Sequence, residues 1–162
     1  MKRVGILTFH SANNFGALLQ AVSLQKTIME RGNVECELID YEPEFIRKDY
    51  SISPFKDNHP KAIIKSALRI PDKIKRNLKF QAFREENIVC SKQCLSEDDF
   101  KNICNSLDEI VVGSDQVWNY NLTKYDMHYF LPEIDASVKK VAYAASTGGA
   151  DFSAQGSNKM MF

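Results

Sequence analysis

The chain has 162 residues, of which 44% are hydrophobic and 26% are charged, a composition typical of one globular domain and not of a disordered or fibrous protein. Its formal net charge at pH 7 is zero, so no overall field attracts nucleic acid, and we expect no nucleic-acid partner. No stretch reaches the roughly 20 apolar residues of a membrane span, and no long apolar region follows Met1, so a cytoplasmic location is expected.

The first part of the chain predicts one strand–helix–strand unit. Residues 4–9 are mostly apolar and bounded by polar residues, which is typical of a short buried strand. Residues 15–31 repeat apolar side chains at 3.6 residues per turn and predict a helix that Asn13 or Asn14 caps. Residues 34–41 predict a second strand. A unit of this kind makes its two strands parallel.

The middle of the chain is less regular. Three prolines interrupt residues 42–60, which are therefore expected to form a loop. Residues 61–70 predict a short helix that ends at Pro71, and Asp72 is expected to cap a longer helix through Asn87.

Basic residues gather in this same region. Between Lys56 and Arg84 there are nine basic and two acidic residues, which gives a local charge of +7. A solvated helix face explains such a cluster. Attraction to phosphate-bearing substrates or to an anionic membrane surface explains it as well, so peripheral contact with the inner face of the membrane is a second expectation.

The last third predicts one more helix and two more strands. Residues 96–106 open with acidic side chains, which favour the positive end of a helix. Residues 108–112 and 140–146 predict strands, separated by an irregular stretch over residues 120–132. Residues 149–162 have no clear period and are expected to form an irregular tail.

Three polar segments follow predicted strands, at residues 10–16, 113–119 and 146–148. If the strands are parallel, these segments meet at one edge of the sheet, where open α/β sheets bind their ligands. The candidate binding residues are His10, Asn13, Asn14, Gly16, Gly113, Ser114, Gln116, Trp118, Asn119 and Ser146.

Asp115 is the candidate catalytic residue, because it is the only carboxylate in these segments and can transfer a proton. His10 is the best-placed imidazole. Three of these candidates have a structural alternative: Asp115 as a turn cap, His10 as a buried histidine with its hydrogen bonds satisfied, and Trp118 as a core side chain.

Bound cofactors and metals are not expected. Residues 10–16 precede a helix and resemble a phosphate cradle, but they contain one glycine where a dinucleotide site needs G-x-G-x-x-G, and they lack a P-loop. Cys90 and Cys94 form a C-x-x-x-C pair without a second pair or neighbouring histidines, which is a poor metal signature.

Four blocks of this sequence resemble the polysaccharide pyruvyl transferase family. They are T-F-H-S-A-N-N-F-G-A-L-L-Q-A (residues 8–21), I-D-Y (39–41), V-G-S-D-Q-V-W-N (112–119) and A-Y-A-A-S (142–146). The third block is the most specific, and the resemblance covers residues 2–148.

The resemblance implies an α/β fold over residues 1–148, a Rossmann-like parallel sheet with flanking helices, like the N-terminal domain of a two-domain GT-B-like enzyme. It implies transfer of pyruvate from phosphoenolpyruvate, the donor substrate, to two hydroxyls of a sugar or lipid-linked glycan, which forms a ketal. The family's second domain is expected to be absent from this chain, so a separate second domain or a homo-oligomer is an expected partner. Two alternatives remain open: a non-catalytic sugar- or phosphate-binding module, and an inactive truncated remnant.

Overall fold

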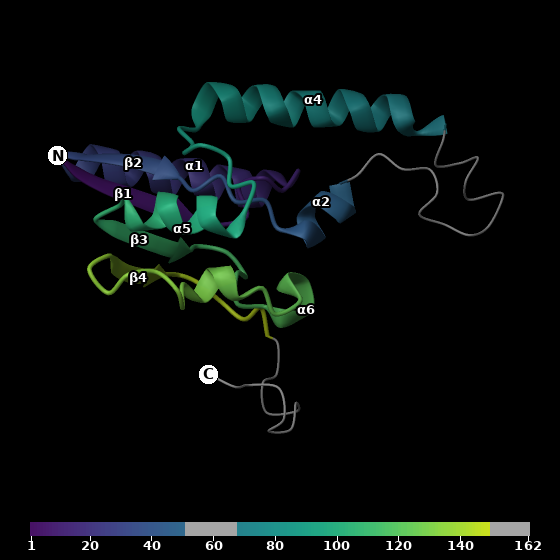
Figure 1. Cartoon of the computed structure of the whole chain (residues 1–162). Helices are drawn as coiled ribbons and strands as arrows, with labels where there is room; N and C mark the ends of the chain where they lie inside the picture. The colour runs from purple at the N-terminus through teal and green to yellow at the C-terminus, as the bar shows by residue number, and fades with distance from the viewer. Residues whose placement is uncertain (51–67, 150–162) are drawn as a thin grey trace, which may run out of the picture.

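A four-stranded parallel sheet forms the centre of the protein. The structure is a computed structural model that describes residues 1–50 and 68–149. The strands lie in the order β2-β1-β3-β4 and all pairs are parallel, which confirms a Rossmann-like α/β fold (Figure 1). Their bounds are β1 Lys2–Leu7, β2 Val34–Leu38, β3 Glu109–Gly113 and β4 Lys139–Tyr143.

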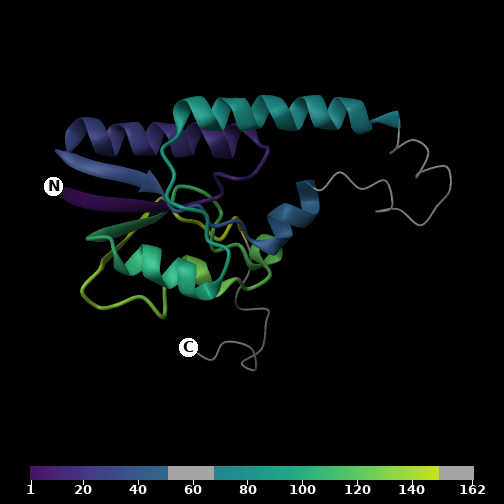
Figure 2. The same cartoon turned by 45° about the horizontal axis from the view of Figure 1, so that its top comes forward.

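Helices cover both faces of this sheet. Helix α1 (Phe15–Arg31) and helix α4 (Ile70–Asn87) lie on one side, and α5 (Glu97–Asn105) lies on the other (Figure 2). The bounds of α1 are those that the sequence predicted, and of the two candidate caps Asn14 is the one used. Ser96 caps α5 by accepting a hydrogen bond from the Asp99 amide, and three acidic residues occupy its first turn.

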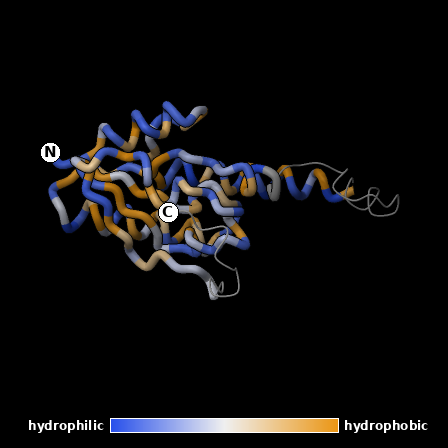
Figure 3. The backbone as a smooth tube through the Cα atoms, turned by 60° about the horizontal axis from the view of Figure 1, so that its bottom comes forward, coloured by the Kyte–Doolittle hydropathy of each residue, from blue (hydrophilic) through white to orange (hydrophobic). Residues whose placement is uncertain are grey.

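The core has two layers because side chains of a strand alternate between the faces of the sheet. On β1, Val4 and Ile6 pack towards α1, whereas Leu7 packs with Phe100 and Cys104 of α5. The hydrophobic stretches of the tube gather around the strands in Figure 3.

Gln25 ties α1 to the edge of the sheet. Its fully buried amide donates to the carbonyls of Cys36 (3.0 Å) and Val89 (2.7 Å) and accepts from the Val89 amide (3.1 Å). The segment that follows α4 also hydrogen-bonds with β2, through Leu38 to Val89 and Ser91 to Leu38. The outer side of β2 is therefore satisfied by backbone and side-chain groups.

The structure corrects several predictions in the middle of the chain. Residues 42–60 were expected to form a loop, but α2 (Glu44–Tyr50) begins directly after Pro43, because proline is compatible with the start of a helix. Pro71 does not end a helix; it lies in the first turn of α4. Asp72 is not the cap, since Arg69 holds that position without a side-chain hydrogen bond.

The later elements need smaller corrections. The stretch expected to be irregular contains a short helix, α6 (Tyr120–Thr123), and a 3-10 turn, η2 (Met127–Phe130). β4 ends at Tyr143, earlier than expected, because the backbone of Ala144 turns to a φ of 48°. Most of the predicted helix over 61–70 and nearly all of the predicted tail lie outside the described residues.

Candidate functional site

A cleft lies at the carboxyl edge of the sheet, between the ends of β1 and β3. At this place the order in which the chain adds strands to the sheet changes direction. From β1 the chain moves outward to β2 and then returns to β3 on the other side of β1. Such a switch point is where open α/β sheets bind ligands. The cleft has a volume of about 840 Å³, and its polar lining includes Asn14, Glu44, Asp115, Gln116, Lys124 and Asp126.

Gly113 allows the segments that follow β3 and β4 to lie close to each other. Its φ is +119°, and a Cβ there would lie 2.3 Å from the Tyr143 carbonyl oxygen and 2.9 Å from the Ala145 nitrogen. Beyond it, the Ser146 amide donates to the Asp115 carbonyl (3.0 Å), and the Trp118 amide donates to the Ser146 carbonyl (3.1 Å). The predicted convergence of these two segments is therefore correct, and Ser146 contributes through its backbone.

Asp115 presents its carboxylate to the cleft. One carboxylate oxygen accepts a hydrogen bond from the Gln116 amide at 2.7 Å. Burial raises the pKa of this carboxyl, against the hydrogen bonds from the Gln116 amide and the Gln20 side chain, which lower it. A half-buried carboxyl with a raised pKa is suited to accepting and returning protons.

Gln116 and Asn119 form a supporting pair. The Asn119 amide donates to Gln116 Oε1 at 3.0 Å, and its oxygen accepts from the Asn121 backbone at 3.1 Å. Asn119 is buried, so it fixes the position of Gln116 and does not line the cleft itself. Ser114, beside them, is half-buried and is also outside the described lining.

The exit of β1 contributes Asn14 to the cleft. The Asn14 side chain accepts from the Gly16 amide at 2.8 Å and from the Ala17 amide at 3.4 Å. Two amides at the start of α1 are thereby satisfied within the chain. The Asn14 side chain thus occupies two of the amide groups that a phosphate bound at the start of α1 would need.

His10 and Asn13 turn away from this cleft. His10 is buried, with Nδ1 3.3 Å from the Thr8 carbonyl and Nε2 3.3 Å from Asp40. Asn13 holds α4 in place, because its side chain donates to Asn77 (2.9 Å) and accepts from Arg84 (3.0 Å). Both residues are therefore positioned to support the fold beside the cleft.

Trp118 packs beneath the segment that follows β3. Its indole nitrogen donates to the Tyr129 carbonyl at 3.1 Å, and its ring stacks on Phe130 with centroids 5.8 Å apart. It packs against the core and is not among the described residues that line the cleft.

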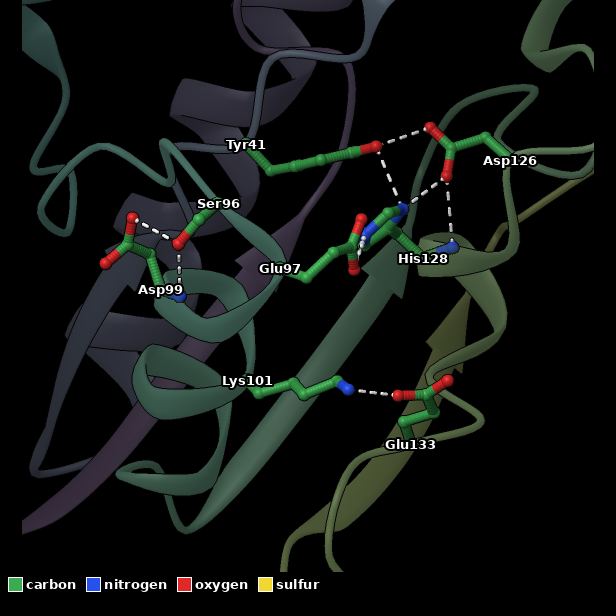
Figure 4. A network of polar contacts seen from close by, with 8 residues as sticks. All are labelled: Tyr41, Ser96, Glu97, Asp99, Lys101, Asp126, His128 and Glu133. Atoms are coloured by element: carbon green, nitrogen blue, oxygen red, sulfur yellow. Dashed lines mark hydrogen bonds and ion pairs between the residues drawn. The ribbon is translucent and has the colours of Figure 1, made fainter.

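A polar network that the sequence analysis did not find borders the cleft (Figure 4). The Tyr41 hydroxyl donates to Asp126 at 2.8 Å, His128 Nδ1 lies 2.6 Å from Asp126, and His128 Nε2 lies 2.9 Å from Glu97. Tyr41 and Asp126 line the cleft, whereas Glu97 is exposed on α5. The network thus joins the cleft to solvent on the α5 side.

Charge and burial act in opposite directions on this network. Burial would lower the pKa of His128, but the hydrogen bond and charge of Asp126, together with Glu97, outweigh it and raise that pKa. Burial would raise the pKa of Asp126, but hydrogen bonds from His128 and Tyr41 lower it. The hydrogen bonds and charges of the network therefore favour the ionised form of Asp126 and the protonated form of His128 more than water does.

We expect the His128→Gln variant to lose about 1–3 kcal/mol of unfolding free energy at about pH 6, the typical cost of a charged hydrogen bond. Because folding raises the pKa of His128, its contribution is complete below its ordinary pKa of about 6.5 and is lost as pH rises through the raised value. Asp126, with its lowered pKa, contributes above its ordinary value of about 3.9. Urea unfolding at several pH values measures this difference, and a gap between wild type and variant that does not shrink above neutral pH contradicts it.

The described residues contain neither a metal-binding cluster nor a membrane-spanning helix. Over residues 1–50 and 68–149, no group of three or more histidine, cysteine, aspartate or glutamate side chains is arranged to hold a metal ion. In the same part of the chain no helix combines the length and apolar character needed to cross a membrane.

Fold and cleft together define a Rossmann-like α/β protein with a cleft at its switch point. The family model described as polysaccharide pyruvyl transferase matches residues 14–160. The chain therefore belongs to the polysaccharide pyruvyl transferase family. The match starts later than the predicted resemblance and extends past residue 148, where that resemblance was expected to end. A comparison with curated proteins gave no match.

Proposed function

We propose that this chain forms the acceptor-binding part of a pyruvyl transferase, which joins pyruvate from phosphoenolpyruvate to two hydroxyls of a glycan sugar. The observation that carries the proposal is the charge of the cleft. Three carboxylates, from Glu44, Asp115 and Asp126, line it, while Lys124 is the single cation among its described lining residues.

This lining is suited to a hydroxyl-rich acceptor. Carboxylates and amides exchange hydrogen bonds with hydroxyl groups, and the rings of Phe9, Tyr41 and Phe45 offer apolar surface to a sugar. Phosphoenolpyruvate is an anion with a phosphate and a carboxylate, and three nearby carboxylates would repel it. The donor site then lies outside this lining, and a second domain or another copy is the proposed source of its cations.

The chemistry assigns a role to Asp115. Protonation of the enol carbon of phosphoenolpyruvate makes its central carbon cationic, and one sugar hydroxyl adds to that carbon. Phosphate then leaves with its bonding electron pair, and the second hydroxyl adds in its place, which gives a cyclic ketal. Each hydroxyl must lose its proton as it adds. We assign Asp115 as the base for one of them, because its half-buried carboxyl faces the cleft and has a raised pKa.

The test supplies the chain with phosphoenolpyruvate and a galactose- or mannose-type acceptor and measures phosphate release. The same assay is run with the chain joined to a second domain of the family. Phosphate release by the chain or by its two-domain form supports the assignment, and no release by either form contradicts it. Saturation-transfer NMR then separates the alternatives: sugar binding without turnover identifies a non-catalytic module, and no binding identifies an inactive remnant.

A further inference from the structure

Helix α4 has two faces of different character. One face packs on the start of α1 and on the segment before it. The centroids of the buried Phe80 ring and of the ring of Phe15, the first residue of α1, lie 4.5 Å apart, and Asn77 and Arg84 hydrogen-bond with Asn13. Arg76 adds a hydrogen bond to the Asn13 carbonyl at 2.9 Å. These contacts fix the orientation of the helix about its own axis.

The opposite face carries an exposed apolar stripe. Pro71, Ile74, Leu78 and Ala82 repeat at intervals of three and four residues, which places them along one side of a helix. Ile74 is 43% exposed and Leu78 is 59% exposed. Together with Lys75 and Lys79 these four residues line an open groove of about 560 Å³. We call the surface formed by these six residues the α4 stripe.

The α4 stripe extends away from the body of the protein. The N-terminal part of α4 lies beyond the sheet in Figure 1, and hydrophobic and hydrophilic turns alternate along it in Figure 3. A groove of this kind, apolar and unsatisfied by its own chain among the described residues, indicates a docking surface.

The positive charge of the groove indicates which kind of partner docks there. The groove contains two lysines and no acidic side chain. A second copy of the chain, docked stripe to stripe about a two-fold axis, would bring the lysines of the two copies close together, and their like charges would repel. An anionic lipid surface instead attracts them, and the long lysine stems let the ammonium groups reach lipid phosphates while the apolar side chains enter below.

We propose that the α4 stripe docks on an anionic lipid surface, with Ile74 and Leu78 entering the headgroup layer and Lys75 and Lys79 contacting lipid phosphates. The cleft lies elsewhere on the molecule, so this docking is independent of the proposed function.

Flotation of the full chain with vesicles tests the proposal. Wild type is expected to float with vesicles of phosphatidylcholine and phosphatidylglycerol in equal parts, less well at raised salt, and not with phosphatidylcholine alone. The Lys75→Ser/Lys79→Ser variant is expected to bind about 30-fold more weakly, since each of the two lysines near an anionic surface contributes on the order of 1 kcal/mol. The Ile74→Asp/Leu78→Asp variant is expected to lose binding to a similar extent.

Met29→Asp is the matched control, because Met29 is an apolar helix residue that is 44% exposed on α1, outside the stripe. It is expected to float like wild type, and all variants are expected to keep the wild-type circular dichroism spectrum. Failure of wild type to float overturns the proposal. So does normal flotation of the Ile74→Asp/Leu78→Asp variant, which would mean that charge elsewhere drives binding. A wild-type dimer in light scattering that this variant dissociates would instead assign the stripe to a second copy.

Discussion

Replacing Asp115 with asparagine is expected to lower kcat by about 10²–10⁴-fold, the usual contribution of a positioned proton-transfer group. Asparagine keeps the shape of the side chain and still accepts the hydrogen bond from the Gln116 amide, but it does not accept a proton from a sugar hydroxyl. Phosphate release from phosphoenolpyruvate, measured in whichever form of the enzyme turns over, gives the rate.

The pH profile separates this role from a structural one. Wild-type activity should fall as the pH is lowered through the raised pKa of Asp115, because the protonated carboxyl no longer accepts a proton. The Asp115→Asn variant should lack that acid limb. Asp135→Asn, at an exposed position outside the cleft, is the matched control and should retain wild-type rates. An Asp115→Asn variant with unchanged kcat would rule out this residue as the base.

Replacing Gly113 with alanine is expected to cost about 3 kcal/mol or more of unfolding free energy, out of the 5–15 kcal/mol of a typical domain. Two effects add: a φ of +119° is strained for alanine, and the new Cβ would lie 2.3 Å from the Tyr143 carbonyl oxygen. The backbone oxygen cannot move without separating the exits of β3 and β4. Urea denaturation measures the loss.

Gly149→Ala provides the control for backbone strain alone. Gly149 has a φ of +76°, but no atom of the described residues lies within 4 Å of the position that a Cβ would take there. This variant is expected to lose only about 1 kcal/mol. Equal losses for the two variants would mean that the close approach of β3 and β4 contributes nothing, contrary to our expectation.

The parts of the fold that the sequence predicted are those with local signals. The cap at Asn14 and the apolar period of α1 lie within the helix itself, so its bounds were predictable. Helix α2 was missed because it has only seven residues and follows directly after Pro43. Such a short helix depends on tertiary packing, here through the buried Ile46, more than on its own sequence.

The candidate site was predictable only in part. Asp115, Gln116 and Asn14 follow strands directly, and parallel strands bring such residues to one edge. The network around Asp126 joins residues more than 80 positions apart, and no local pattern indicates it. His10 and Asn13 also follow a strand, but the direction in which a loop turns depends on what packs against it, in this case α4.

The two outer strands of the sheet differ in how they are protected against aggregation. The outer side of β2 is occupied by the chain between Val89 and Ser91 and by the Gln25 amide, so it offers little template for another strand. Among the described residues no strand pairs with the outer side of β4. Lys139 and Lys140 are exposed at the start of that strand, and their like charges oppose the pairing of two copies edge to edge.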